Sequence, residues 1–138
     1  MLFRSASKLK KLTWKVGDVT REALVYVPAP AGKKPPLVFA FHGHGGKAEY
    51  SAKKFAIHQH WPEAVCVYPQ GLPTPSPGID PQGKMSGWQK AVGDQQDRDL
   101  DFFDAMLKSM KADYQIDETR VYSTGHSNGG FLPAGAGA

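Results

Sequence analysis

The sequence has few of the features that stabilise secreted domains or anchor proteins in membranes. It contains a single cysteine, Cys66, so an internal disulfide bond is excluded. Because Cys66 lies in an apolar run, we expect it to be a small buried side chain. No stretch reaches the roughly 20 apolar residues that a membrane-spanning helix needs. The N-terminus has basic residues but no apolar segment behind them, so no signal peptide is predicted and the localisation stays open.

Motifs for binding metals or nucleic acids are also missing. The four histidines of one short span are accompanied by few carboxylates and by no Cys/His spacing typical of zinc, so we expect no bound metal. The net charge is +4, with much of the excess near the N-terminus, but no nucleic-acid-reading module is present. The basic segment therefore favours a solvated strand pair. The clustered histidines are His42, His44, His58 and His60.

What the chain does contain fits one globular domain over residues 1–138. Hydrophobic residues make up 41% of the chain and charged residues 22%, which is enough to build a buried core. The length of 138 residues also falls within the range of about 100–200 residues for one domain. We therefore expect a single compact unit without internal repeats.

Apolar patterning predicts an α/β fold. Residues 36–41 and 63–69 are continuous apolar runs, which are typical of parallel strands buried on both faces. Residues 9–27 have the pattern of two strands separated by Gly17 and Asp18, which indicates an N-terminal antiparallel pair. Strands that alternate with helices predict a mostly parallel sheet. The remaining elements are expected as helices over 48–60 and 97–114 and as a short strand over 120–124.

The sequence Gly-His-Ser-Asn-Gly-Gly follows the last of these strands. A G-x-S-x-G pattern occurs often by chance, but a preceding strand and a following helix start are the context of a nucleophile elbow. Gly125 and Gly129 leave room for a sharp turn that exposes Ser127 as the nucleophile. The backbone N–H of Asn128 is then an expected oxyanion donor. The alternative is an ordinary glycine-rich turn. His126 would point away from the serine, so it is not expected to be the base.

A second glycine-rich motif, residues 42–46 (HGHGG), follows the buried strand at 36–41. Glycines let a backbone approach a developing negative charge closely. We expect the backbone N–H of His44 or Gly45 to supply the second oxyanion donor. His42 is expected to anchor this segment by hydrogen bonding at the edge of the substrate pocket. We call residues 42–46 the glycine loop and residues 125–130 the elbow.

Residues 70–96 form a long segment rich in proline and glycine, which we call the long loop. Long loops in compact domains are uncommon and often functional. This one leaves the carboxyl end of a strand, where open α/β sheets bind ligands. Met85 and Trp88 could therefore line an acyl or aromatic pocket. An equally weighted alternative is that Trp88 covers the core beneath the loop.

The order of these motifs resembles that of the polyhydroxybutyrate-depolymerase-like esterases, a family that includes feruloyl and acetylxylan esterases. The similarity extends over roughly residues 20–130. It implies an α/β-hydrolase fold, hydrolysis of small or polymeric carboxylic esters through an acyl-enzyme on Ser127, and no cofactor; its members are often exported. The matching segments are TREALVYVPA, PLVFAFHGHGG, VCVYPQG, SGWQ, the Asp-rich helix and IDETRVYSTGHSNGG.

The chain departs from that family after the nucleophile. In this fold the triad acid and histidine follow the serine in sequence, but residues 128–138 contain neither. We therefore expect a partial α/β-hydrolase fold that lacks its C-terminal strands, through a truncation or a shifted reading frame, and that is weakly active or inactive alone. Asp80 and Asp94 lie on the correct side of the sheet, and His42 and His44 are the nearest histidines, but no motif gives them the missing roles.

Two further expectations follow from this departure. Missing strands would leave an exposed sheet edge, which favours a homodimer that a solution mass measurement would detect. A chain that keeps its pocket but lacks a base could instead be a non-catalytic protein that binds a ligand or a polysaccharide surface, and the Trp88 loop is the feature that suggests it.

Overall fold

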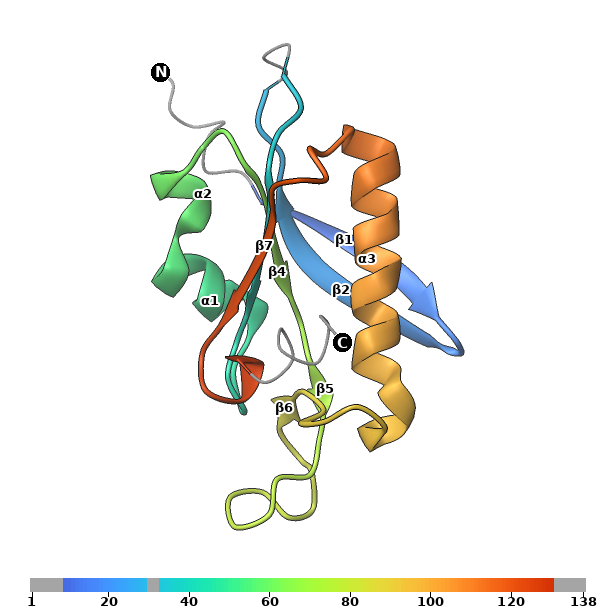
Figure 1. Cartoon of the computed structure of the whole chain (residues 1–138). Coiled ribbons are helices and arrows are strands. Elements are labelled where there is room, and N and C mark those ends of the chain that lie inside the picture. Colours follow the sequence, from blue (N-terminus) through green and yellow to red (C-terminus); the bar gives the residue numbers. More distant parts are fainter. Residues whose placement is uncertain (1–8, 30–32, 131–138) are drawn as a thin grey trace.

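The computed structural model describes residues 9–29 and 33–130 and forms one mixed sheet between two layers of helices (Figure 1). Helix α3 covers one face of the sheet, and α1 and α2 cover the other. A small β5-β6 hairpin and a 3-10 turn at Asp94–Asp97 lie in the long loop. The elements are β1 (Lys10–Val16), β2 (Val19–Tyr26), β3 (Leu37–Phe41), α1 (Ala48–Phe55), α2 (Ile57–His60), β4 (Val65–Pro69), β5 (Leu72–Pro73), β6 (Ser86–Gly87), α3 (Arg98–Tyr114) and β7 (Val121–Gly125).

The strand order β1-β2-β4-β3-β7 confirms the predicted α/β fold with an N-terminal antiparallel pair. Strands β3, β4 and β7 run parallel, and β2 joins them antiparallel to β4. Along β3 and β7 the register pairs Leu37 with Val121 and Phe41 with Gly125. Because both strands end at the same level, the glycine loop and the elbow leave the sheet next to each other.

The continuous apolar runs are buried on both faces, as their composition predicted. In β3, Phe39 and Phe41 point into a core beneath α3, whereas Val38 and Ala40 point into a second core beneath α1 and α2. Cys66 belongs to the second core, and its burial raises the pKa of the thiol to about 12. Cys66 is therefore a packing residue, because its thiol stays protonated at neutral pH.

The helix predicted over 48–60 is interrupted in the structure. Ala56 has a φ of 48°, and this left-handed residue ends α1 and begins α2. The buried ring of His58 explains the break, since its Nδ1 lies 2.7 Å from the Tyr68 hydroxyl in β4. Alanine favours a continuous helix, so a tertiary contact overrides local propensity here.

A buried ion pair joins β2 to the start of α3. Arg21 Nη2 donates to Asp99 Oδ1 at 2.8 Å, and the two side chains are 1% and 0% exposed. Gln89 of the long loop contacts the same helix end, because its N–H donates to Asp99 Oδ2 at 2.7 Å and its Oε1 accepts from the N–H of Asp99 at 2.9 Å. The end of the long loop is thereby tied to the core.

Strand β7 is at one end of the sheet and pairs only with β3 in the part of the chain that is described. Its residues Tyr122, Ser123 and Thr124 are exposed. The predicted sheet edge is thus present among these residues, while pairing of two copies along it stays a prediction. Across residues 9–29 and 33–130, no helix has both the length and the apolar character that a membrane span requires.

Candidate active site

The elbow places Ser127 in a strained and exposed turn directly after β7. Ser127 has a φ of 53°, a left-handed value that non-glycine residues seldom adopt. The turn is closed by two hydrogen bonds, from the Gly129 N–H to the His126 carbonyl and from the Gly130 N–H to the Ser127 carbonyl, both at 2.9 Å. Strain of this kind gathers at functional sites. The Ser127 side chain is exposed, so it is accessible to a ligand.

Two glycines of the elbow are required by close backbone packing. A Cβ at Gly129 would overlap the carbonyl oxygens of Phe41 and His42, and a Cβ at Gly125 would overlap the carbonyl group of Gly129. The His126 N–H also donates to the Phe41 carbonyl at 3.1 Å. The elbow is therefore held tightly against the end of β3.

The glycine loop lies beside the nucleophile. A Cβ at Gly43 would be 3.6 Å from the Cβ of Ser127 and 3.2 Å from the carbonyl oxygen of His126. The two glycine-rich motifs, residues 42–46 and residues 125–130, thus meet at the carboxyl ends of β3 and β7. This is the arrangement on which the nucleophile and oxyanion predictions depend.

The structure separates the two predicted donors of the glycine loop. The Gly45 N–H already donates to the Ser86 carbonyl at 2.6 Å, so it is not available to an oxyanion. The N–H groups of His44 and Asn128 have no backbone acceptor within residues 9–29 and 33–130. Within the described residues, His44 and Asn128 therefore stay the candidate backbone donors for a ligand.

His42 is an internal anchor of the site. Its side chain is buried, and burial lowers the pKa of the imidazole. Gly71 N–H donates to Nε2 at 2.9 Å, and Nδ1–H donates to the Gly43 carbonyl at 2.7 Å. Because both ring nitrogens are used, His42 joins the glycine loop to the long loop. It neither reaches the predicted pocket nor is free to act as a base.

Trp88 is also a core residue. The side chain is 0% exposed, packs edge-on against Phe41, and donates from Nε1 to the His42 carbonyl at 2.8 Å. Its backbone is held by the Asn128 side chain, where Oδ1 accepts from the Trp88 N–H at 2.7 Å and Nδ2 donates to the Trp88 carbonyl at 3.1 Å. Of the two interpretations of Trp88, the structure supports the one in which it covers the core.

Met85 is the predicted pocket residue that does reach solvent. Its side chain is 42% exposed, and a Cβ at Gly45 would be 3.4 Å from its sulfur. The thioether thus lies over the glycine loop. An apolar group of a bound ligand could contact it there, so Met85 stays a pocket candidate, while His42 and Trp88 support the site from beneath.

Sequence reasoning did not identify a buried contact between the two loops. His44 Nε2 lies 2.9 Å from Asp80 Oδ2. The same carboxylate accepts from the N–H groups of Lys84 at 3.0 Å and Met85 at 2.9 Å, and these hydrogen bonds, with the one to His44, lower the pKa of Asp80 to about 2. Thirty-six residues separate the partners in sequence, so no local pattern could reveal the pair.

In the described part of the chain, no side chain hydrogen-bonds to the Ser127 hydroxyl, and no group of three or more His, Cys, Asp or Glu residues is placed to hold a metal ion. Asp117, which precedes the other end of β7, accepts hydrogen bonds from Thr119 and Arg120 and lies away from Ser127.

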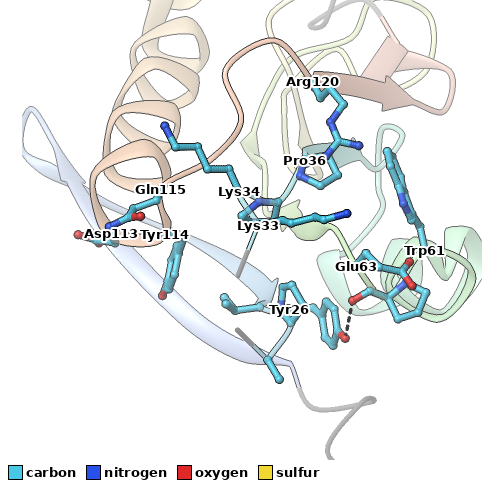
Figure 2. Close-up of a pocket in the computed structure, with 15 residues that line it drawn as sticks. Tyr26, Lys33, Lys34, Pro36, Trp61, Glu63, Asp113, Tyr114, Gln115 and Arg120 are labelled. Atoms are coloured by element: carbon cyan, nitrogen blue, oxygen red, sulfur yellow. Dashed lines mark hydrogen bonds between the residues drawn. The ribbon is translucent and has the colours of Figure 1, made fainter. Parts of the chain in front are cut away.

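A cavity of about 1060 Å³ lies at the opposite end of the sheet, where β3 begins (Figure 2). Tyr26, Trp61 and Tyr114 line it together with Lys34 and Arg120. The Leu37 N–H, at the start of β3, donates to the Arg120 carbonyl. Because Ser127 follows the other ends of these strands, this cavity is separate from the elbow.

Comparisons with known proteins agree with the motif order. No protein-family model matches the chain. A probable feruloyl esterase C of Aspergillus clavatus is 35% identical over 100 residues, which cover 70% of this chain and 32% of that protein. The chain therefore spans about a third of the length of the curated relative that it matches.

Solved structures show the fold. An acetyl xylan esterase from Aspergillus awamori superposes with a TM-score of 0.60 and 19% identity, covering 88% of this chain and 43% of that one. A ferulic acid esterase from Anaeromyces mucronatus, in complex with ferulic acid, superposes with a TM-score of 0.56 and 19% sequence identity. The superposition covers 88% of this chain and 49% of that one. The predicted likeness to polyhydroxybutyrate depolymerases in particular stays a prediction. The chain therefore has part of an α/β-hydrolase fold, and its sequence is similar to that of a probable feruloyl esterase.

Proposed function

We propose that this chain carries the nucleophile and the oxyanion-binding groups of a carboxylic ester hydrolase, with Ser127 as the nucleophile. The observation that supports it most strongly is the exposed Ser127 at a φ of 53°, beside the glycine loop. The relationship to a feruloyl esterase supports ester substrates, either small or polymeric, with short acyl, feruloyl or polyester-like groups.

In the proposed reaction Ser127 Oγ attacks the ester carbonyl carbon, and the carbonyl oxygen becomes an oxyanion. The N–H groups of His44 and Asn128 donate to that oxygen. Collapse of the intermediate releases the alcohol and leaves an acyl-Ser127, which water hydrolyses. The hydroxyl proton of Ser127 passes to water in this scheme, because no described side chain accepts it. Loss of triad members typically costs about 10⁴–10⁶ in rate, so we expect slow turnover by the chain alone.

The test is covalent labelling with a fluorophosphonate probe. Wild type should be labelled on Ser127 and should hydrolyse p-nitrophenyl acetate and butyrate above the buffer rate, and Ser127→Ala should lose both activities. Ser123→Ala is the matched control, because Ser123 is an exposed serine on β7 that lies outside the elbow. It should be labelled as wild type is. A folded wild-type chain that is not labelled, or a Ser127→Ala variant that is labelled equally, would refute the proposal.

The alternative function, a non-catalytic binder of a ligand or polysaccharide surface, is not proposed. The feature that suggested it was the Trp88 loop in a chain without a base, and in the structure the Trp88 indole is fully buried.

A further inference from the structure

We propose that His44 and Asp80 are positioning residues, a largely buried side-chain pair that fixes the glycine loop so that the His44 backbone N–H points at the oxyanion. The proposal rests on the proposed function of Ser127. It adds a role for the long loop, residues 70–96, which the pair joins to the glycine loop.

The pair is enclosed. The His44 and Asp80 side chains are 9% and 8% exposed, and the contact between Nε2 and Oδ2 is 2.9 Å long. On the other edge of the ring, a Cβ at Gly87 would overlap His44 Nδ1. The imidazole is therefore confined between Asp80 and the backbone of β6. Surface ion pairs contribute little to structure, but a confined carboxylate does orient an imidazole.

Asp80 is itself held firmly. Its carboxylate accepts two backbone N–H groups, from Lys84 and Met85, and its backbone exchanges two hydrogen bonds with Ser76, at 2.7 and 2.8 Å. A pKa of about 2 keeps the carboxylate ionised at neutral pH, so it can only accept, and Nε2 of His44 carries the hydrogen. The position of the ring is thus set by the fold of the long loop.

This anchor acts on the turn that presents the donor. The Gly46 N–H donates to the Gly43 carbonyl at 2.9 Å, and Gly45 has a φ of 82°, which are the features of a type II turn with His44 and Gly45 at its centre. Gly45 is held through its N–H by the Ser86 carbonyl, and His44 is held through its side chain. With both central residues fixed, the His44 N–H keeps one direction.

His44 is not the base in this scheme. Its Nε2 is bound to Asp80, its Nδ1 faces Gly87, and no hydrogen bond joins it to Ser127 in the described residues. The ring acts on the reaction through the backbone. Misplacing an oxyanion donor weakens an interaction that forms in the transition state, so it lowers kcat rather than raising KM.

The decisive variant is His44→Ala, which keeps the backbone N–H and removes the anchor. Displacement of a catalytic group by about 1 Å can cost about 100-fold, so we expect kcat and the rate of fluorophosphonate labelling to fall about 10- to 100-fold, with KM within about twofold of wild type. Asp80→Ala should have the same effect, and the double variant should be no worse than either single one, because they remove one contact. Asp80→Asn keeps an acceptor for Nε2 and should recover part of the loss.

Asp94→Ala is the matched control, because Asp94 is an exposed carboxylate of the same long loop. Amide hydrogen exchange gives a readout that does not depend on catalysis: the Gly45 N–H should exchange at least tenfold faster in His44→Ala and in Asp80→Ala, and at the wild-type rate in Asp94→Ala. If a folded His44→Ala variant keeps both the wild-type labelling rate and the slow Gly45 exchange, the positioning role is refuted. If the wild-type protein is never labelled, the proposed function is refuted instead. The hydrogen-exchange rates then decide by themselves whether the His44–Asp80 pair fixes the glycine loop.

Discussion

Replacing Gly129 with alanine should destabilise the protein by about 3 kcal/mol or more and abolish fluorophosphonate labelling of Ser127. The added Cβ would overlap the carbonyl oxygens of Phe41 and His42, which belong to the end of β3 and the start of the glycine loop. Backbone atoms cannot turn away as a flexible side chain can, so the elbow must move off the strand. That movement separates Ser127 from the glycine loop, and the labelling rate should fall by more than about 100-fold.

The neighbouring glycine provides the control. Among the described residues, a Cβ at Gly130 would meet nothing closer than 3.7 Å, so the unfolding free energy of Gly130→Ala should lie within about 0.5 kcal/mol of wild type and its labelling rate should be unchanged. Urea denaturation measures the first quantity and probe kinetics the second. Equal behaviour of the two variants would show that the elbow does not pack against β3 in solution.

The sequence was most informative where one local pattern determines the structure. The apolar runs in β3 and β4 are typical of strands buried on both faces, and the order strand, glycine-serine turn, helix start predicted the position of the elbow. Both signals arise from residues that are adjacent in sequence. The helix break at Ala56 was not predicted, because alanine is a strong helix former and the cause, the contact of His58 with Tyr68, lies in another element.

The parts of the site that could not be predicted depend on contacts between distant residues. The sequence predicted either His44 or Gly45 as the second oxyanion donor. The structure distinguishes them, because the Gly45 N–H already donates to the Ser86 carbonyl. Whether Trp88 lines a pocket depended on the contacts of its indole with Phe41 and with the His42 carbonyl, which lies 46 residues away. The sequence assigned no role to Asp80, because no residue near it in the sequence indicates that His44 is its partner.

Replacing Asp99 with alanine should cost about 3–5 kcal/mol of unfolding free energy, because it leaves the buried Arg21 guanidinium without its counter-charge. Both side chains are essentially inaccessible to water. Burial lowers the pKa of Arg21, and Asp99 opposes that shift, which indicates that the carboxylate offsets part of the desolvation cost. Urea denaturation measures the loss, and Asp101→Ala, an exposed acid of the same helix, should remain within about 0.5 kcal/mol of wild type.

A double variant separates the charge from the packing. Arg21→Met combined with Asp99→Leu removes both ions, so no uncompensated charge stays buried, and most of the lost stability should return. The Gln89 N–H nevertheless loses its acceptor in either variant, so the end of the long loop is released from α3. Because the same loop carries Trp88, whose backbone Asn128 holds, labelling of Ser127 should stay below the wild-type rate even where stability recovers. If Asp99→Ala unfolds at the same urea concentration as Asp101→Ala, the pair is not buried in solution and this link between the core and the elbow is absent.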